Sequence, residues 1–127
     1  MLIQLALMPQ MFAVCRFDPH TPAADLLPST GFFAFTRTED ELSLVVDQSA
    51  VQPDWQAETG WRGMKVLGPL DFSLIGILSS LALPLANSGI SIFAISTYDT
   101  DYLLVKADKL SSALASLREA GFVIQEN

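Results

Sequence analysis

Residues 64–125, MKVLGPLDFSLIGILSSLALPLANSGISIFAISTYDTDYLLVKADKLSSALASLREAGFVIQ, decide the fold of this chain. Residues 64–70 have the composition of a β-strand, and residues 72–88 have the three- and four-residue hydrophobic spacing of a helix. The same patterns predict strands at 91–96, 102–106 and 122–125, and a second amphipathic helix at 109–120. This β-α-β-β-α-β order is typical of a ferredoxin-like α+β unit.

The ends of the two expected helices carry recognisable signals. Asp71 is a candidate N-cap for the first helix, because its carboxylate can accept a hydrogen bond from the first turn. Gly89 is a candidate C′ residue, with Ile90 after it for the capping contact, and Gly121 ends the second helix. Pro84 cannot donate a backbone hydrogen bond, so we expect a kink late in the first helix.

The first half of the chain has a weaker version of the same pattern. Strands are expected at residues 2–8, 11–17, 31–36 and 42–47. Only a short helix fits residues 23–27, because prolines flank them, and residues 48–60 form a polar connector. The boundary falls near Gly60, which gives one module at residues 1–60 and another at 61–127. Each is too small to be stable alone, so we expect them to pack into one unit.

Two segments resemble each other at an offset of 60 residues. Residues 32–47 read FFAFTRTEDELSLVVD and residues 92–107 read IFAISTYDTDYLLVKA. Each predicts a hairpin, with an acidic turn at residues 36–41 and at residues 96–101. Four of the sixteen aligned positions are identical, which indicates a duplication but is also compatible with two unrelated hydrophobic hairpins.

The composition excludes several classes of protein. Half of the residues are hydrophobic and 17% are charged, so the chain should fold throughout. A net charge of −7 without a basic stripe disfavours nucleic acid and anionic membranes as partners. The one cysteine, Cys15, is expected to be a buried strand residue that forms no internal disulfide. The longest apolar run, residues 72–86, is too short to span a membrane, so we expect a cytoplasmic protein.

Three stretches carry a resemblance to a known family. They are GPLDFS at residues 68–73, GIL at 76–78 and GISIFAISTYDTDY at 89–102. The chain resembles the tandem ACT-domain family, which includes bacterial proteins of unknown role and the animal cytosolic arginine sensors. The resemblance covers residues 61–122, and the first half resembles the divergent first module of that family. It implies two ferredoxin-like (βαββαβ) ACT modules in tandem, the first divergent and reduced, with a ligand-binding regulatory role.

The resemblance also implies a binding site for a small molecule, an amino acid, at the interface between modules. In ACT modules the loop from the first strand to the first helix presents backbone N–H groups to the ligand, as helix N-termini generally can. The corresponding residues here are Leu70, Asp71, Phe72, Ser73 and Gly76. The following turn would contribute Ser96, Thr97, Asp99 and Asp101. Asp101 corresponds to an acidic ligand contact of the arginine sensors, and a carboxylate there would hold an α-ammonium group.

One position departs from the arginine sensors. Leu74 lies near where they carry the acidic side chain that reads the guanidinium group. A neutral amino acid, or a different metabolite, is therefore the expected ligand.

Each candidate residue also has a structural explanation. Asp71 and Ser73 can serve as helix caps, and Asp99 and Asp101 can be solvated turn residues. The single histidine, His20, lies in a proline-rich loop with no catalytic motif around it, and we expect it at the surface. A magnesium site on the two aspartates would need a third ligand source. We therefore expect no enzyme activity, no metal and no cofactor.

Two functions remain. The first is a regulatory sensor that binds an amino acid between its ACT modules. The second is a structural protein-interaction module with a vestigial ligand site. Stabilisation by a specific small molecule would distinguish them. Because ACT modules associate through sheet edges or helices, and an open edge strand invites pairing, a homodimer is also expected.

Overall fold

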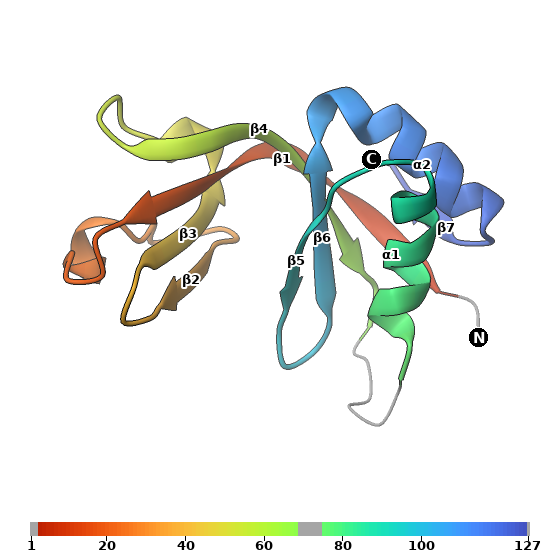
Figure 1. The fold of residues 1–127 in the computed structure, drawn as a ribbon, viewed down its shortest axis with the longest axis horizontal. Coiled ribbons are helices and arrows are strands. Elements are labelled where there is room, and N and C mark those ends of the chain that lie inside the picture. Colours follow the sequence, from red (N-terminus) through yellow and green to blue (C-terminus); the bar gives the residue numbers. More distant parts are fainter. Residues whose placement is uncertain (1–2, 69–74, 127) are drawn as a thin grey trace. The chain divides into compact units, whose positions relative to one another are not determined.

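The computed structural model describes residues 3–68 and 75–126 of the chain (Figure 1). It contains seven strands and two α-helices in an α+β arrangement. The strands are β1 (Gln4–Phe17), β2 (Ala34–Arg37), β3 (Leu42–Asp47), β4 (Gln56–Val66), β5 (Phe93–Ser96), β6 (Asp101–Lys106) and β7 (Val123–Gln125). The helices are α1 (Ile77–Asn87) and α2 (Leu110–Glu119), with short 3-10 turns η1 (Ala23–Asp25), η2 (Gln48–Ala50) and η3 (Ala107–Lys109).

Internal contacts divide the chain into two compact units. Unit 2 consists of residues 10–61, and unit 1 combines the residues up to Pro9 with those from Arg62 onward. The expected boundary near Gly60 coincides with one of these divisions, whereas the first residues group with the second half. The assignment of one ACT-like module to residues 1–60 and another to 61–127 stays a prediction.

Unit 1 has the expected β-α-β-β-α-β order from β4 to β7. Its strands follow the order β1-β4-β6-β5, and β7 pairs in parallel with β1. Both helices pack against the sheet through one hydrophobic core (Figure 1). The core is built from Leu5, Leu7, Met64, Val66, Leu103 and Val105 of the strands and Leu81, Leu85, Ala113, Leu114 and Leu117 of the helices. Because these strand residues alternate in sequence, they identify the helix-covered face of the sheet.

Helix α1 ends as predicted but starts later. The Ile90 N–H donates to the Leu85 carbonyl (2.9 Å) and the Gly89 N–H to the Ala86 carbonyl (3.0 Å), which is the Schellman arrangement. The expected start at residue 72 is wrong, because Ile75 and Gly76 are not helical and Gly76 holds the N-cap position. Asp71, the expected N-cap, lies outside the described residues. The kink at Pro84 stays a prediction.

Unit 2 is built around the antiparallel β2–β3 hairpin and the part of β1 that pairs with β3. Residues 23–27, expected to be helical, form only the turn η1. Cys15 lies in the core of this unit and is 1% exposed, as expected for a buried strand residue. Burial raises the pKa of its thiol above the ordinary value. The ring of Trp55 packs edge-on against Phe17, with ring centroids 5.0 Å apart.

The two hairpins expected from the sequence are present, but their elements correspond at an offset of 59 residues, so the alignment at an offset of 60 was wrong by one residue. Adding 59 to the bounds of β2, β3 and η2 gives the bounds of β5, β6 and η3. The two hairpins have the same turn length, because Arg37 faces Leu42 and Ser96 faces Asp101. The alignment at 60 matched hydrophobic strand residues that lie on opposite faces of the two hairpins.

His20 is exposed, and its backbone N–H donates to the Asp18 carboxylate at 2.9 Å. Neither α1 nor α2, nor any other helix in the described ranges, is long and apolar enough to cross a membrane.

Candidate functional site

Three segments of unit 1 lie at the same end of its sheet. They are the end of β4, the start of α1 and the four-residue turn between β5 and β6 (Figure 1). This follows from the topology, because α1 runs back from the end of β4 and the β5–β6 hairpin turns at the same end. Of the nine residues predicted to bind a ligand, Gly76, Thr97 and Asp99 belong to these segments, and Ser96 and Asp101 flank the turn at the ends of β5 and β6.

The β5–β6 turn is held by its two threonines. The Thr97 N–H donates to the Thr100 carbonyl at 2.8 Å, and the Thr97 hydroxyl to the same carbonyl at 3.1 Å. Thr100 is only 4% exposed, and its Oγ1 donates to the Val66 carbonyl at 2.6 Å. This last bond ties the turn to the end of β4. Thr97, a predicted ligand contact, is thus already engaged within the turn.

A small cavity opens beside this bond. Its volume is about 170 Å³, and the described residues that line it are Lys65, Gly68, Asp99 and Thr100. Lys65 and Asp99 are exposed and carry opposite charges. The described lining of the cavity therefore includes one cationic residue, one anionic residue and the buried Thr100.

Asp101 and Ser96 form a separate pair. The Ser96 hydroxyl donates to the Asp101 carboxylate at 2.6 Å across the β5–β6 ladder. Asp101 alternates with Leu103 and Val105, so it lies on the helix-covered face of β6, toward the start of α1. It is half-buried and is not among the described residues that line the cavity. Asp99 and Asp101 therefore occupy different environments, although both lie at the same end of the sheet.

Gly76 holds the N-cap position of α1 with φ +80°. Its carbonyl accepts the Ser80 N–H at 2.9 Å and the Ser79 hydroxyl at 3.1 Å. An added Cβ would meet nothing closer than the Ser79 Oγ at 3.8 Å, so the positive φ alone explains the glycine. Contact with a ligand at this position stays a prediction. Four further predicted residues, Leu70, Asp71, Phe72 and Ser73, lie outside the described residues, as does Leu74.

Sequence reasoning did not single out Lys65. Lys65 lies between the buried residues Met64 and Val66, and this pattern indicates only an exposed strand position. Its proximity to Asp99 depends on the pairing of distant strands. Within residues 3–68 and 75–126, no group of histidine, cysteine or acidic side chains is arranged to hold a metal ion.

Comparison with known proteins gives a consistent picture. The ACT domain family model matches residues 56–119, about half of the chain. The human cytosolic arginine sensor for mTORC1 subunit 1 is 35% identical over 98 residues, which are 71% of this chain and 30% of the sensor. The bovine sensor gives the same figures. The chain thus spans less than a third of the length of these curated relatives.

Solved structures extend the similarity to the whole chain. A protein from Agrobacterium tumefaciens superposes with a TM-score of 0.93 at 31% identity, over 100% of this chain and 95% of its own. A protein of unknown function from Vibrio cholerae has a TM-score of 0.77 at 24% identity, covering 94% and 90%. The ligand-free regulatory subunit of aspartate kinase from Thermus thermophilus has a TM-score of 0.65 at 15% identity, covering 91% and 96%. The last two share the fold alone.

Proposed function

Because the chain belongs to the ACT domain family, we propose that it is a regulatory sensor protein whose ligand is an amino acid. Its relatives include proteins named as cytosolic arginine sensors, and a regulatory subunit of aspartate kinase shares its fold. The observation that carries the proposal is the cavity between the end of β4 and the β5–β6 turn, whose described lining includes one cationic residue, Lys65, and one anionic residue, Asp99.

The charges of the cavity match those of a free amino acid. Lys65 would bind the α-carboxylate and Asp99 the α-ammonium group, each through a charge-assisted hydrogen bond. Neither end of the ligand would then be left unpaired in the site, which would otherwise cost free energy. The volume of about 170 Å³ favours a small side chain over a long cationic one.

Asp101 is an alternative holder of the ammonium group. It is half-buried and bonded to the Ser96 hydroxyl, so its carboxylate is already oriented. In this second arrangement the N-terminus of α1 at Gly76 would bind the carboxylate through backbone N–H groups. The two arrangements differ in which aspartate is essential. In both, every named ligand contact belongs to unit 1, and a position of the ligand between two ACT modules stays a prediction.

A thermal-shift screen of the twenty amino acids at about 1 mM tests the proposal. A ligand with a dissociation constant near 10 μM would be present at about 100 times that constant and add ~2.7 kcal/mol of stability. This corresponds to a rise of several degrees in Tm. A hit should lose its effect when either its carboxylate or its amine is removed. A flat panel would contradict the proposal and favour the interaction module with a vestigial site.

Three variants then distinguish the arrangements. Lys65→Met and Asp99→Asn should abolish the shift if the cavity holds the ligand, and Asp101→Ala should leave it unchanged. The reverse result would support the second arrangement. Asp108→Asn is a matched control, because Asp108 is exposed in η3, which follows the end of β6 opposite to Asp101.

A further inference from the structure

The β2–β3 turn of unit 2 is a structural counterpart of the turn at the candidate site. At the offset of 59 residues, residues 38–41 correspond to residues 97–100, so Asp40 holds the place of Asp99. In both turns the first residue is a threonine whose N–H donates to the carbonyl of the fourth residue at 2.8 Å. The threonine hydroxyl donates to the same carbonyl, at 3.3 Å in unit 2 and 3.1 Å in unit 1. Unit 2 therefore repeats the turn on which the proposed ligand site is built.

The two turns are tied to the neighbouring strand by different groups. In unit 1 the donor lies in the turn, because the Thr100 Oγ1 donates to the Val66 carbonyl of β4 at 2.6 Å. The fourth residue of the other turn is Glu41, and an ionised carboxylate can only accept hydrogen bonds. There the donor lies in the strand, because the guanidinium group of Arg16 in β1 donates to the Asp40 carbonyl at 3.0 Å. Arg16 thus takes over the role of Thr100.

The cations of the two units are consequently used in different ways. Lys65 of β4 lines the candidate cavity, where it can meet a carboxylate. Unit 2 contains only two lysine or arginine residues, Arg16 and Arg37. Arg37 donates to the carbonyls of Pro19 and Thr21 at 3.0 and 2.8 Å. Both arginines of unit 2 are therefore engaged with backbone carbonyls of their own unit.

The distribution of charge also disfavours a carboxylate in unit 2. Residues 10–61 contain eight acidic and two basic residues and have a net charge of −6, whereas the rest of the chain contains six acidic and five basic residues and has a net charge of −1. The potential around unit 2 is therefore negative and repels an anionic group. A ligand that needs a cation for its carboxylate is better matched by the turn of unit 1.

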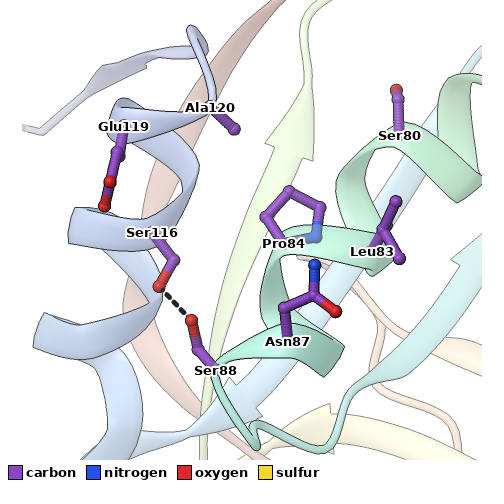
Figure 2. Close-up of a pocket in the computed structure, with 8 residues that line it drawn as sticks. All are labelled: Ser80, Leu83, Pro84, Asn87, Ser88, Ser116, Glu119 and Ala120. Atoms are coloured by element: carbon purple, nitrogen blue, oxygen red, sulfur yellow. Dashed lines mark hydrogen bonds between the residues drawn. The ribbon is translucent and has the colours of Figure 1, made fainter.

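The groove between α1 and α2 is a poorer match for the same ligand, although it is larger (Figure 2). Its volume is about 510 Å³, and its described lining contains one charged residue, Glu119, which would repel a carboxylate. The hydroxyl groups of Ser88 and Ser116 bond to each other across it, with their oxygens 2.6 Å apart. Among its described residues the groove thus has no cation to pair with the ligand.

The turn of unit 1 is therefore the best match for an amino acid in each of these comparisons. We propose that each chain binds one amino acid, at the β5–β6 turn of unit 1, and that Arg16 closes the equivalent β2–β3 turn of unit 2; this inference rests on the proposed function. Arg16 is a positioning residue, because it acts through the turn of its own unit and does not touch the ligand.

Isothermal titration calorimetry of the whole chain counts the sites. With the twenty amino acids as probes, added singly, we expect each one that binds to saturate at one molecule per chain. Saturation at two molecules per chain would overturn the inference and leave the proposed function standing. If none of the twenty binds, the proposed function fails and the inference fails with it.

Asp40→Asn tests whether the turn of unit 2 takes part in binding. The substitution removes from unit 2 the charge that Asp99→Asn removes from unit 1, at the equivalent position of the turn. The dissociation constant of any amino acid that binds should be the same for Asp40→Asn and wild type. Roughly tenfold weaker binding by Asp40→Asn would overturn the inference.

Arg16→Met tests the closing contact without any ligand. It keeps most of the length of the side chain and removes the donor, so the turn at residues 38–41 should open more often. We expect the Thr38 amide proton, which is bonded across this turn, to exchange with solvent at least about twofold faster. Lys109→Met, at an exposed cation of η3, is the control and should leave this exchange unchanged. Equal exchange in Arg16→Met and wild type would overturn the role given to Arg16.

Discussion

The hydrogen bond from Thr100 to Val66 offers a direct measure of how firmly the β5–β6 turn is tied to β4. Thr100 is the only buried polar side chain among the described residues, and its Oγ1 lies 2.6 Å from the Val66 carbonyl oxygen. Thr100→Val keeps the shape of the side chain and replaces the hydroxyl with a methyl group. The backbone bonds of the turn remain, so the substitution removes this one interaction.

The expected loss follows from the burial of the bond. A typical intramolecular hydrogen bond contributes about 0.5–1.5 kcal/mol, and an acceptor left buried without a partner costs about 1–3 kcal/mol. Since a carbonyl oxygen can accept more than one bond, we expect an intermediate loss of about 1–2 kcal/mol for Thr100→Val. For a chain of 127 residues this lowers the Tm by roughly 4–8 °C.

Differential scanning calorimetry measures the change in Tm, and urea unfolding measures the change in the free energy of unfolding. Thr36→Val is the control, because Thr36 is exposed on β2, and surface substitutions ordinarily change stability by less than about 0.5 kcal/mol. Equal stabilities for wild type and Thr100→Val would refute the reasoning, since they would mean that the turn is held without this bond.

Three further predictions concern single residues. Gly89→Ala should lower the free energy of unfolding by about 1–2 kcal/mol. The reason is the backbone φ of +73°, since an added Cβ would meet no atom within 4 Å; a wild-type midpoint in urea would contradict it. The Cys15 thiol, buried and with a raised pKa, should react with a thiol reagent at pH 8 only after unfolding, and rapid reaction of the native protein would show that the site is accessible. Hydrogen bonds from the Ser49 N–H and hydroxyl lower the pKa of Asp47, so its folded pKa lies below the unfolded value of about 3.9. This stabilisation is present above about pH 4 and is lost as the pH falls through the folded pKa. The stability difference between wild type and Asp47→Asn should therefore shrink below about pH 4, and a difference that stays constant from pH 7 to pH 2 would exclude this cause.

Local signals were sufficient for much of unit 1. The order of strands and helices followed from hydrophobic periodicity, and the end of α1 at Gly89 followed from capping rules. The start of α1 was not predicted correctly from such signals, because Leu74 and Ile77 continue the helical spacing and Asp71 is a good cap in isolation. Gly76 was the overlooked signal. Its positive φ interrupts the helix, and a glycine is the residue that permits it.

Strand lengths in the first half depended on pairing between distant residues. Pro9 indicated a break between two strands, yet β1 continues through it as a single strand. Proline is tolerated where its missing N–H is not needed for the ladder, and Pro9 is exposed there. The polar residues at the start of β4 were predicted to form a connector, because their pairing with distant strands is not visible in the sequence. Their strand conformation comes from their neighbours in the sheet rather than from their own propensity.

The candidate site was predicted in part. The resemblance indicated the β5–β6 turn and the start of α1, and the two segments lie at the same edge of unit 1 (Figure 1). The grouping of Lys65 with Asp99 was not predictable, because the two residues are far apart in sequence and no motif links them. The separation of Asp99 from Asp101 was also missed. It arises because Asp99 belongs to the turn and Asp101 to the strand after it.

The parallel pairing of β1 with β7 has a consequence for how the protein is made. Leu5 faces Ile124, so an early part of unit 1 meets its partner only after nearly all the intervening chain has been synthesised. At about 5–20 residues per second a ribosome needs roughly 6–24 seconds to cover that distance. During this interval Leu5 and Leu7 stay without most of the core that buries them until the helices and β6 have been synthesised. A nascent chain stalled before α1 should therefore expose these leucines to chaperones.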